Sequence, residues 1–395
     1  MSAPWLDVVG IGEGGVTELS ATARDALRRA GVVIGGDRHH ALAPDITAER
    51  RRWPSPFDAM IDEIRSLRDR RPALLVTGDP LWYSVGARIV RSIPAQEVRF
   101  HPQLSAFQWA ACRMGWSLAD CATLTVHGRP AEQILPHIAP RARLLVLTQD
   151  AQTPAIVAGL LRARGHGDSR MVALAALGGA SEERFEGRAD DWHHAVPDFH
   201  TLAIDCAGTD RLPLTGLPDD AFEHDGQITK RDVRAATLAK LAPFADAVLW
   251  DVGLGCGSVS IEWMRAARGA QAFGVEPKVG RRRLAQGNAR RLGVPRLRIV
   301  EGEAPAALDG LPRPDAVFVG GGLSEAVVER CLDALGPGGR LVANVVTLES
   351  EGLLIDLHER HGGELTRIAV FHAEPVGPYR GWRSSMPVTQ WSWTK

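Results

Sequence analysis

The chain repeats one pattern of apolar and polar positions from end to end. Short runs of apolar residues, at 73–76, 144–147, 247–250 and 272–275, end in glycine or polar turns, and so does the mainly apolar stretch 6–9. Longer segments with apolar residues at helical spacing follow them. Continuous apolar runs are typical of strands that are buried on both faces of a parallel sheet. Their alternation with helices predicts an α/β protein.

The best defined of these junctions lies in the second half. The run 247–250 is followed by a turn that contains Gly253, Gly255 and Gly257, and then by a segment with helical spacing. Strand, glycine turn and helix together form the ligand-binding corner of an open α/β sheet. Glycines are needed there because the turn is tight and its backbone must approach a ligand closely.

The spacing of the glycines indicates the ligand. A dinucleotide fingerprint has its third glycine at the position that Ser258 holds here. Glu276 ends the next apolar run and is placed to accept hydrogen bonds from ribose hydroxyls. An adenosine with an amino-acid tail suits this turn better than one with phosphates, so the expected ligand is S-adenosylmethionine (SAM). The alternative is a structural glycine turn in another kind of α/β protein.

These residues resemble the class I methyltransferases. The resemblance implies a Rossmann-like domain with a mostly parallel seven-stranded sheet. It also implies contacts to SAM from the turn, from the acid and from the residues after the third strand. Those residues are Asp251, Gly253, Gly255, Gly257, Glu276, Glu303 and Ala304. Leu254 departs from the family, which usually has a small residue there, and puts in question how freely the methionine end of SAM fits.

The first half carries other pieces in a fixed order. A glycine loop follows the first strand, and a polar cluster, 37–40, follows the second; the cluster is either a solvated loop or part of a site. Gly78 opens a Gly-Asp-Pro turn whose backbone groups are expected to be left free for a ligand. A Pro-x-x-Ser segment ends at Ser105, which is expected to cap a helix. A His-Gly-Arg triplet at 127–129 and a Thr-Pro pair complete the series.

Together these pieces resemble the tetrapyrrole methylases, a separate SAM-dependent fold with two α/β lobes. The resemblance implies that SAM lies in a cleft between the lobes and is held largely by backbone atoms. The residues implied to line this cleft are Gly78, Asp79, Leu81, Ser105 and Ala106. His127 and Arg129 either form a structural network at a strand end or meet carboxylates of a polyanionic substrate, for which the arginine fork is suited.

The segment 222–231, which precedes the helix predicted at 232–241, resembles the decarboxylating precorrin methyltransferases. The resemblance implies that Gln227 and Thr229 approach SAM. It also implies that Lys230 and Arg231 receive carboxylates of the substrate. The alternative for these two residues is a basic extension of the helix that is exposed to water.

Further candidates lie elsewhere in the second half. Near the C-terminus, aromatic and basic side chains occur together and are suited to flank a flat acidic macrocycle. These are Tyr379, Arg380, Trp382 and Arg383. Two more strands, at 366–373 and 386–393, are expected to complete the sheet. His127 and Glu303 are the candidates for a general acid or base because they titrate or accept near the inferred clefts.

Composition narrows the classes of function. The chain has 395 residues, 45% of them hydrophobic and 24% charged, and a formal net charge of −1. This charge gives no general attraction to nucleic acid or to an anionic membrane. The five cysteines are scattered without a CxxC pair, so no zinc site or disulfide scaffold is expected and no metal is assigned. No signal peptide or membrane-spanning run is visible, and a cytoplasmic protein is expected.

Two domains are expected for a chain of this length. Residues 1–207 are predicted to form the two-lobed tetrapyrrole methylase domain, and residues 218–395 the class I methyltransferase domain. The turn-rich stretch 208–217 is the predicted linker between them.

Two different SAM-binding halves indicate two methylations of one substrate, with one SAM per domain. The combined resemblance implies methylation of precorrin-6B at meso carbons C5 and C15, with decarboxylation of the ring C acetate, to give precorrin-8 in cobalamin biosynthesis. A homo-oligomer is expected, with a tetramer through the C-terminal domain as one form. The alternatives are a methyltransferase for RNA or protein, with the neutral charge counting against RNA, and a non-catalytic SAM sensor in which Leu254 blocks one site.

Overall fold

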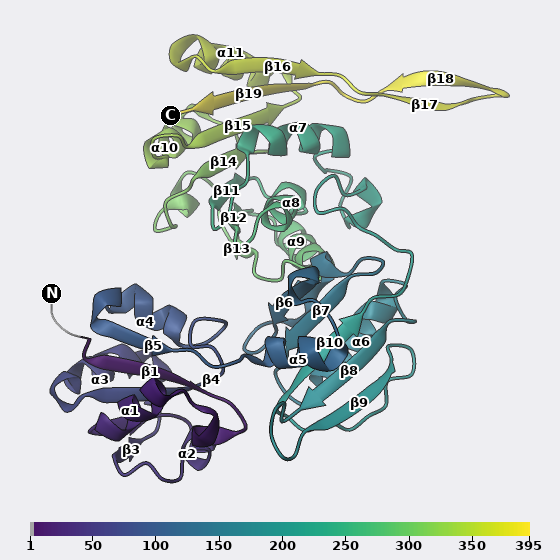
Figure 1. Ribbon diagram of the computed structural model, residues 1–395. Helices are drawn as coiled ribbons and strands as arrows, with labels where there is room; N and C mark the ends of the chain where they lie inside the picture. The colour runs from purple at the N-terminus through teal and green to yellow at the C-terminus, as the bar shows by residue number, and fades with distance from the viewer. Residues whose placement is uncertain (1–3) are drawn as a thin grey trace. The chain divides into compact units, whose positions relative to one another are not determined.

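The computed structural model describes residues 4–395, which form two compact units (Figure 1). The first unit contains the described residues up to Ala131 together with His137–Asp210. The second contains Glu132–Pro136 and Arg211–Lys395. Within the described residues, no helix combines the length and the apolar character that crossing a membrane requires.

The first unit is built on two five-stranded sheets. Its strands are β1 (Leu6–Ile11), β2 (Val32–Ile34), β3 (Glu49–Arg51), β4 (Pro72–Thr77), β5 (Val98–His101), β6 (Cys121–Thr125), β7 (Arg143–Leu147), β8 (Arg170–Ala175), β9 (Glu183–Arg188) and β10 (His200–Asp205). Its helices are α1 (Ala21–Arg29), α2 (Asp37–Ala41), α3 (Met60–Ser66), α4 (Gly86–Ser92), α5 (Ala106–Met114) and α6 (Thr153–Ala163).

The first sheet is parallel throughout, in the order β3-β2-β4-β1-β5. Apolar residues of α1 pack on one face, and those of α3 and α4 pack on the other. Because both faces are covered, β4 is buried up to its last residue, as its continuous apolar run predicts. The carboxyl ends of β1 and β4 lie side by side, with Ile11 paired to Thr77.

The second sheet is mixed, in the order β6-β7-β10-β8-β9. Only β6 and β7 run parallel in it, and the remaining neighbours are antiparallel. Phe107 and Ala111 of α5 pack against Leu145, Val172 and other apolar residues of the sheet. The first unit therefore has the two α/β lobes that the sequence predicts.

The second unit is a three-layer α/β domain. Its strands are β11 (Val248–Val252), β12 (Gln271–Val275), β13 (Arg298–Val300), β14 (Ala316–Val319), β15 (Arg340–Val345), β16 (Glu364–Ile368), β17 (Phe371–Val376), β18 (Tyr379–Ser384) and β19 (Val388–Thr394). Its helices are α7 (Arg231–Leu241), α8 (Ser258–Ala266), α9 (Val279–Arg291), α10 (Glu325–Ala334) and α11 (Leu348–His361).

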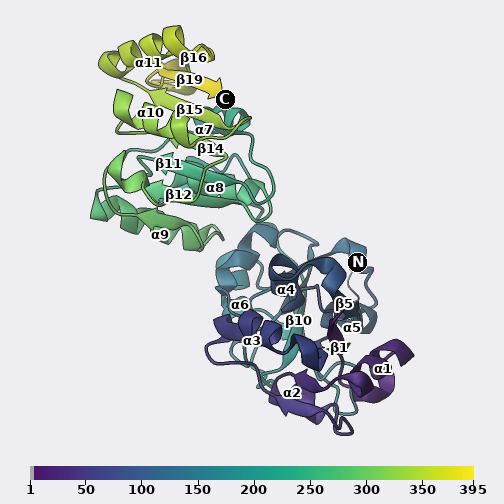
Figure 2. The same ribbon diagram turned by 90° about the vertical axis from the view of Figure 1, so that its left-hand side faces the viewer.

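Seven of these strands form one sheet in the order β13-β12-β11-β14-β15-β19-β16, and Figure 2 shows it from β16 at the top to β12 below. Strand β19 is antiparallel to both of its neighbours. Apolar residues of α7, α8 and α9 pack on one face, and those of α10 and α11 on the other. The predicted α/β class and the mostly parallel seven-stranded sheet are confirmed.

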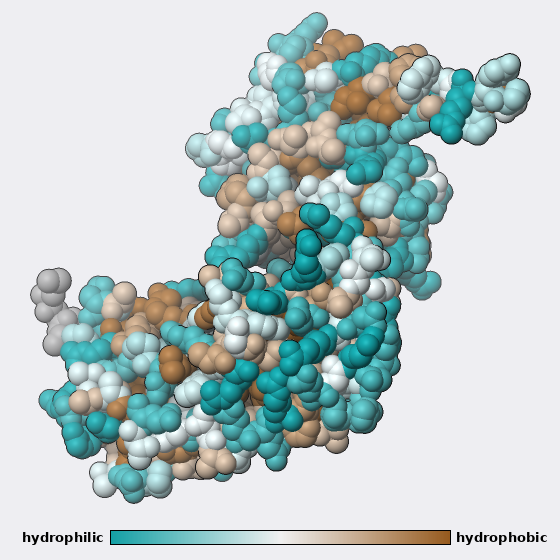
Figure 3. Space-filling view, turned by 45° about the vertical axis from the view of Figure 1, so that its right-hand side comes forward, coloured by the Kyte–Doolittle hydropathy of each residue, from teal (hydrophilic) through white to brown (hydrophobic). Residues whose placement is uncertain are grey.

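The prediction of one continuous strand at 366–373 is wrong, because this range contains parts of two strands. Strand β16 ends at Ile368, and Phe371 begins β17, which pairs with β18 in a separate two-stranded sheet. This hairpin projects from the domain (Figure 1), and its surface in Figure 3 is mostly polar or neutral. The hairpin has no buried face, so no apolar alternation marks its boundaries in the sequence.

Side chains of α8 hold residues 213–217 against the second unit. Glu262 accepts hydrogen bonds from the N–H groups of Gly216 at 2.6 Å and Leu217 at 2.9 Å. Arg265 donates to the carbonyls of Pro213 at 2.9 Å and Leu214 at 3.3 Å. The segment that leads into the second unit is therefore part of its packed structure.

Candidate functional sites

The glycine turn of the second unit has the strand-turn-helix form that the sequence predicts. Gly253, Gly255 and Gly257 have φ of 77°, 57° and 83°, a region that disfavours residues with a Cβ. A Cβ on Gly253 would lie 2.6 Å from the backbone nitrogen of Gly321 in the turn after β14. The turns after β11 and β14 are therefore in direct backbone contact.

The predicted acid lies against this turn. Glu276 follows β12 and is 3% exposed. Its Oε2 accepts a hydrogen bond from the Gly255 N–H at 2.9 Å, and its Oε1 accepts one from the Lys278 N–H at 3.0 Å. Each carboxylate oxygen has a second lone pair, so Glu276 can hold the turn and still accept from a ligand hydroxyl.

A second carboxylate is buried beneath the turn. Asp251 on β11 is 1% exposed, and its Oδ2 accepts a hydrogen bond from Ser260 Oγ at 2.6 Å. Its Oδ1 has no partner in the described part of the chain. Burial raises the pKa of Asp251 to about 6, although the hydrogen bonds from Ser260 act in the opposite direction. A donor or cation on a ligand would complete this buried acceptor.

Leu254 points into the core. This position bears on how freely the methionine end of SAM fits beside it. Its side chain is 5% exposed and belongs to the apolar cluster beneath α8 and α9. A Cβ on Gly274 would lie 2.4 Å from Leu254 Cδ1. The absence of a side chain at Gly274 gives Leu254 room inside the sheet, so the structure does not support the alternative in which Leu254 blocks the ligand.

Arg281 of α9 fixes part of the segment that is expected to lie over the cofactor. Its Nε donates to Asp225 Oδ2 at 2.8 Å, and its Nη2 donates to Gln227 Oε1 at 2.5 Å. Lys230 is the residue before α7, with its Nζ 3.8 Å from an Asp219 carboxylate oxygen. The side chains of Lys230 and Arg231 are exposed, and their contact with a substrate stays a prediction.

Thr229 is fixed by a buried arginine that the sequence analysis did not identify. Arg234 of α7 is fully buried, and its Nη1 donates to the Thr229 carbonyl at 2.6 Å. Its Nε donates to Glu262 Oε1 at 2.7 Å, and its Nη2 donates to the Leu217 carbonyl. One side chain therefore connects the segment before α7 to the interior of α8.

The turn after β13 carries the two residues that are expected to meet the adenine ring. Glu303 is exposed, and Ala304 packs at the edge of an apolar cluster. Arg282 of α9 donates to the Glu276 carbonyl at 3.1 Å and lies 2.8 Å from a Glu301 carboxylate oxygen. This arginine connects the ends of β12 and β13, so the turn with Glu303 and Ala304 lies near Glu276.

The structure does not bring the aromatic and basic residues of the C-terminal region to the glycine turn. They lie on β18 of the projecting hairpin, where Tyr379 is 78% exposed and Trp382 77% exposed. Arg380 is exposed as well, and Arg383 Nη1 lies 2.9 Å from Glu374 Oε2. Their role at a macrocycle stays a prediction.

Three loops converge in the first unit around Gly78. Its N–H donates to the Ile11 carbonyl at 3.1 Å, and its φ is 61°. A Cβ on Gly78 would lie 3.0 Å from the Ser105 Cα. Asp79 Oδ1 accepts from the Leu81 N–H at 2.7 Å, and the Leu81 side chain is exposed. The expectation that this turn leaves its backbone groups free is therefore wrong for the Gly78 and Leu81 N–H groups.

The helix α5 begins after Ser105, as predicted, but the serine hydroxyl does not make the cap. Gln108 Oε1 accepts a hydrogen bond from the Ser105 N–H at 2.7 Å. Ser105 Oγ is buried and has no partner among the described residues. An unpaired buried hydroxyl costs free energy, so Ser105 Oγ is suited to bond a ligand beside Gly78.

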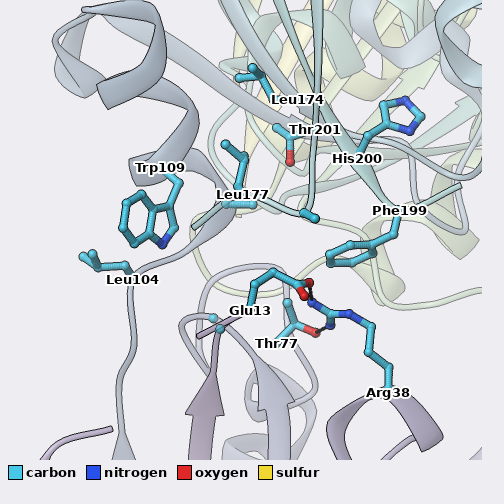
Figure 4. Close-up of a pocket in the computed structure, with 14 residues that line it drawn as sticks. Glu13, Arg38, Thr77, Leu104, Trp109, Leu174, Leu177, Phe199, His200 and Thr201 are labelled. Atoms are coloured by element: carbon cyan, nitrogen blue, oxygen red, sulfur yellow. Dashed lines mark hydrogen bonds and ion pairs between the residues drawn. The ribbon is translucent and has the colours of Figure 1, made fainter. Parts of the chain in front are cut away.

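These loops open onto a hollow in the first unit (Figure 4). Gly78 and Ala106 line it, whereas Asp79, Leu81 and Ser105 lie outside its lining. The lining also includes residues that the sequence analysis did not place there. These are Gly12, Glu13, Arg38, Thr77, Leu104, Trp109, Leu174, Ala176, Leu177, Phe199, His200 and Thr201.

The His-Gly-Arg triplet does not line this hollow. His127 and Arg129 are exposed in the turn after β6. The His127 N–H donates to Thr125 Oγ1 at 3.2 Å, and Arg129 Cζ lies 5.8 Å from the centre of the Tyr83 ring. These contacts fit the structural alternative. Catalysis by His127 and substrate binding by Arg129 stay predictions.

The polar groups of the hollow have only a weak signal in the sequence. Arg38 belongs to the polar cluster after β2, which forms the short helix α2. Glu13 follows β1, Thr77 ends β4, and Phe199 precedes β10. They meet only in the folded chain. Across residues 4–395, no group of three or more His, Cys, Asp or Glu side chains is arranged to hold a metal ion.

Comparisons with known proteins find a matching family for each half of the chain. Residues 6–192 match the family of tetrapyrrole (corrin/porphyrin) methylases, and residues 220–395 match a precorrin methyltransferase domain. A precorrin-6Y C(5,15)-methyltransferase (decarboxylating) from Sinorhizobium sp is 47% identical, over 100% of this chain and 97% of its own length. One from Mycobacterium tuberculosis is 41% identical, over 98% and 99%.

Several solved structures are similar to parts of the chain. One of them is the C-terminal domain of precorrin-6Y C5,15-methyltransferase from Rhodobacter capsulatus, which is 52% identical. The match covers 47% of this chain and 100% of that domain, with a TM-score of 0.45. The identity to the two relatives from Sinorhizobium sp and Mycobacterium tuberculosis extends over nearly the whole of each chain. The chain therefore belongs to the family of decarboxylating precorrin-6Y C(5,15)-methyltransferases.

Proposed function

We propose that this chain catalyses the SAM-dependent methylation of precorrin-6B at meso carbons C5 and C15 and the decarboxylation of its ring C acetate, to give precorrin-8. The observation that carries the proposal is the 47% identity over the whole chain to a relative named precorrin-6Y C(5,15)-methyltransferase (decarboxylating). Membership of a methyltransferase family makes SAM the methyl donor. We further propose that each unit binds one SAM.

Two unpaired buried atoms support one SAM site per unit. Asp251 Oδ1 lies beneath the glycine turn of the second unit, and Ser105 Oγ lies beside Gly78 in the first. A carboxylate suits the ammonium of the methionine end, and a hydroxyl suits a polar atom of the same ligand. Both lie beside glycines whose missing side chains let a second turn pack closely, Gly321 against Gly253 and Ser105 against Gly78.

The chemistry asks mainly for positioning. Bound SAM supplies an electrophilic methyl group, and the meso carbon of a reduced macrocycle is enamine-like, so no strong protein base is required. Holding donor and acceptor in line provides much of the acceleration. In the second unit, Arg234 and Arg281 fix the segment with Thr229 and Gln227. In the first, Trp109, Leu177 and other apolar residues of the lining limit the access of water.

We assign decarboxylation and one methylation to the second unit and the other methylation to the first. Support comes from the likeness of the segment before α7 to decarboxylating precorrin enzymes. In the full chain, Gly253→Val adds a side chain against Gly321, and Gly78→Val adds one against Ser105. We expect Gly253→Val to abolish release of carbon dioxide and Gly78→Val to preserve it. The reverse result would overturn the assignment.

The reaction is tested with the purified chain, precorrin-6B and SAM labelled with ¹³C in its methyl group. We expect two labelled methyl groups and one carbon dioxide per product molecule. Calorimetric titration of SAM should give two equivalents per chain. A chain that transfers no methyl group to the precorrin would contradict the proposed activity. A single SAM equivalent alongside two transferred methyl groups would contradict only one site per unit.

We also propose that the chain forms a homo-oligomer through its C-terminal domain. The hairpin β17–β18 supports this, because Val376, Tyr379 and Trp382 on it are more than half exposed, and an isolated two-stranded hairpin is only marginally stable in water. Light scattering should give a mass that is a multiple of 42.7 kDa. Trp382→Glu should lower that mass, whereas a monomeric native chain would rule the proposal out. No specific observation favours a methyltransferase for RNA. A non-catalytic SAM sensor was considered because Leu254 could block one site, and the inward position of Leu254 does not support that alternative.

A further inference from the structure

Arg38 brings a positive charge to the hollow of the first unit. Its guanidinium lies between Glu13, Thr77 and the ring of Phe199 (Figure 4). Its Nη1 donates to Thr77 Oγ1 at 3.4 Å, its Nη2 pairs with Glu13 Oε1, and its Cζ lies 3.8 Å from the centre of the Phe199 ring. Among the described residues of the lining, no other lysine or arginine is present.

The neighbour of Arg38 on α2 determines how Thr77 can bond. His39 Nδ1 accepts a hydrogen bond from the Gly36 N–H at 3.1 Å, which assigns the ring proton to Nε2. That Nε2 lies 2.9 Å from Thr77 Oγ1 and donates to it. Burial, together with the charge of Arg38, lowers the pKa of His39 to about 4, so the ring is neutral near pH 7.

Thr77 is consequently left as a donor. Its hydroxyl oxygen already accepts from His39 and Arg38, and a hydroxyl has only two lone pairs. Its own proton must therefore point to an acceptor, and Thr77 lines the hollow. The Thr77 hydroxyl and the guanidinium thus offer adjacent donors to one ligand group.

In the structure, Glu13 accepts a hydrogen bond from the guanidinium of Arg38. Its side chain is 17% exposed and that of Arg38 is 33% exposed, so the pair is partly shielded from water. A guanidinium has five N–H donors in a planar fork, which matches the geometry of a carboxylate. A carboxylate ligand would compete with Glu13 for this fork and would be repelled by the charge of Glu13.

We propose that Arg38 and Thr77 form a subsite for a carboxylate side chain of the tetrapyrrole substrate, and that Glu13 pairs with Arg38 until that group arrives. The inference rests on the proposed function and deepens it. In Figure 4, Arg38 and Phe199 lie across the hollow from Leu104 and Trp109, next to which the SAM contacts at 105–106 are expected. We therefore assign the carboxylate that binds Arg38 to the macrocycle. The alternative is the carboxylate at the methionine end of SAM.

The experiment uses the full chain, precorrin-6B and SAM labelled with ¹³C in its methyl group. The two meso methyl groups give separate resonances, so the two transfers are followed in one sample. We expect Arg38→Gln to raise the KM for the precorrin in one transfer by about 10- to 100-fold, because a hydrogen-bonded charge is lost. The dissociation constants of SAM should stay within about twofold. Glu13→Gln should change the same KM in the opposite direction, since it removes the competitor.

The control is Arg28→Gln on α1, whose side chain is 74% exposed and pairs with Asp25 outside the hollow; it should change neither constant. Weaker SAM binding with an unchanged KM for the precorrin would assign the carboxylate to SAM and overturn the inference. Equal changes of the KM for the precorrin in Arg38→Gln and Glu13→Gln would show that the two residues form a purely structural ion pair. This result would also overturn the inference.

A variant that fails to fold and a native chain without activity also have defined consequences for the inference. The second transfer reports on folding in every sample, and if Arg38→Gln fails to fold, Arg38→Lys keeps the charge without the fork and should still raise the KM. An unchanged KM in Arg38→Lys and Glu13→Gln would then overturn the inference. A native chain that methylates nothing would remove the proposed function and the subsite together, whereas native methylation with unaltered variants would remove only the subsite.

Discussion

The guanidinium of Arg234 lies against the carboxylate of Glu262, with both side chains fully buried and Nε 2.7 Å from Oε1. The pair also holds backbone groups of the segment before α7, because Glu262 accepts from Leu217 and Arg234 donates to Thr229. Buried charges in proteins are paired because an isolated one is expensive. The segment before α7 is thus supported from the interior of the domain.

Removing one partner of this pair should be strongly destabilising. We expect Arg234→Met to lower the free energy of unfolding by about 3–5 kcal/mol, since Glu262 would be left buried without its cation. Urea denaturation followed by fluorescence measures this change. The matched control is Arg330→Met, whose partly exposed pair with Asp309 should contribute less than about 1 kcal/mol. Equal losses in the two variants would contradict the role of the buried pair.

Gly253→Ala should abolish SAM binding at the second unit while leaving the first unit's site intact. Its φ of 77° disfavours a Cβ, and the added atom would lie 2.6 Å from the Gly321 nitrogen. Calorimetric titration should therefore fall from two equivalents to one. Gly280→Ala in α9 is the control, because its Cβ meets open space and alanine favours a helix by about 1 kcal/mol over glycine. Retention of two equivalents in Gly253→Ala would show that the turn tolerates the side chain.

Leu254→Ala should destabilise the second unit without improving SAM binding. The side chain fills core space above Gly274, so its truncation should cost about 2–5 kcal/mol. Gly274→Ala alone should also destabilise, because its Cβ would lie 2.4 Å from Leu254 Cδ1. The double variant should lose less than the sum of the two. Strict additivity in thermal or urea unfolding would disprove this packing, and tighter SAM binding in Leu254→Ala would show that Leu254 faces the ligand.

Asp251 should make the free chain less stable as the pH rises from 4 to 6. Its pKa is about 6 in the folded chain against an ordinary 3.8. The folded state therefore holds the proton more tightly than the unfolded state does. The stability from this protonation is complete below pH 3.8 and lost as the pH rises through 6, a change of about 3 kcal/mol. Asp251→Asn should remove this slope when unfolding free energies are measured without SAM. Parallel pH profiles for the native chain and Asp251→Asn would refute the assignment.

The second unit was largely predictable because its signals are local. Gly253, Gly255 and Gly257 are close in sequence, and Glu276 follows at the end of the next strand, so one βαβ unit contains them all. The strand order then follows from the domain type. The effect of Leu254 stayed open because a sequence does not show which way a residue between glycines points.

The first unit's site was less predictable because its residues come from distant segments. Arg38 and Phe199 lie 161 positions apart in the chain, yet the guanidinium and the ring are in contact. Neither residue type is unusual in its local sequence. The hairpin β17–β18 was missed for another reason: its strands have no buried face, so the alternation that marks a strand is absent.

The backbone contact between Gly253 and Gly321 makes the turns after two adjacent strands mechanically inseparable. No side chain cushions them, so a shift of the turn after β14 has to displace the turn after β11 as well. Under the proposed function, the turn after β14 would meet the macrocycle and the turn after β11 would seat the methyl donor. The two turns would then move together, so loading of the donor and entry of the substrate would be coupled through this contact.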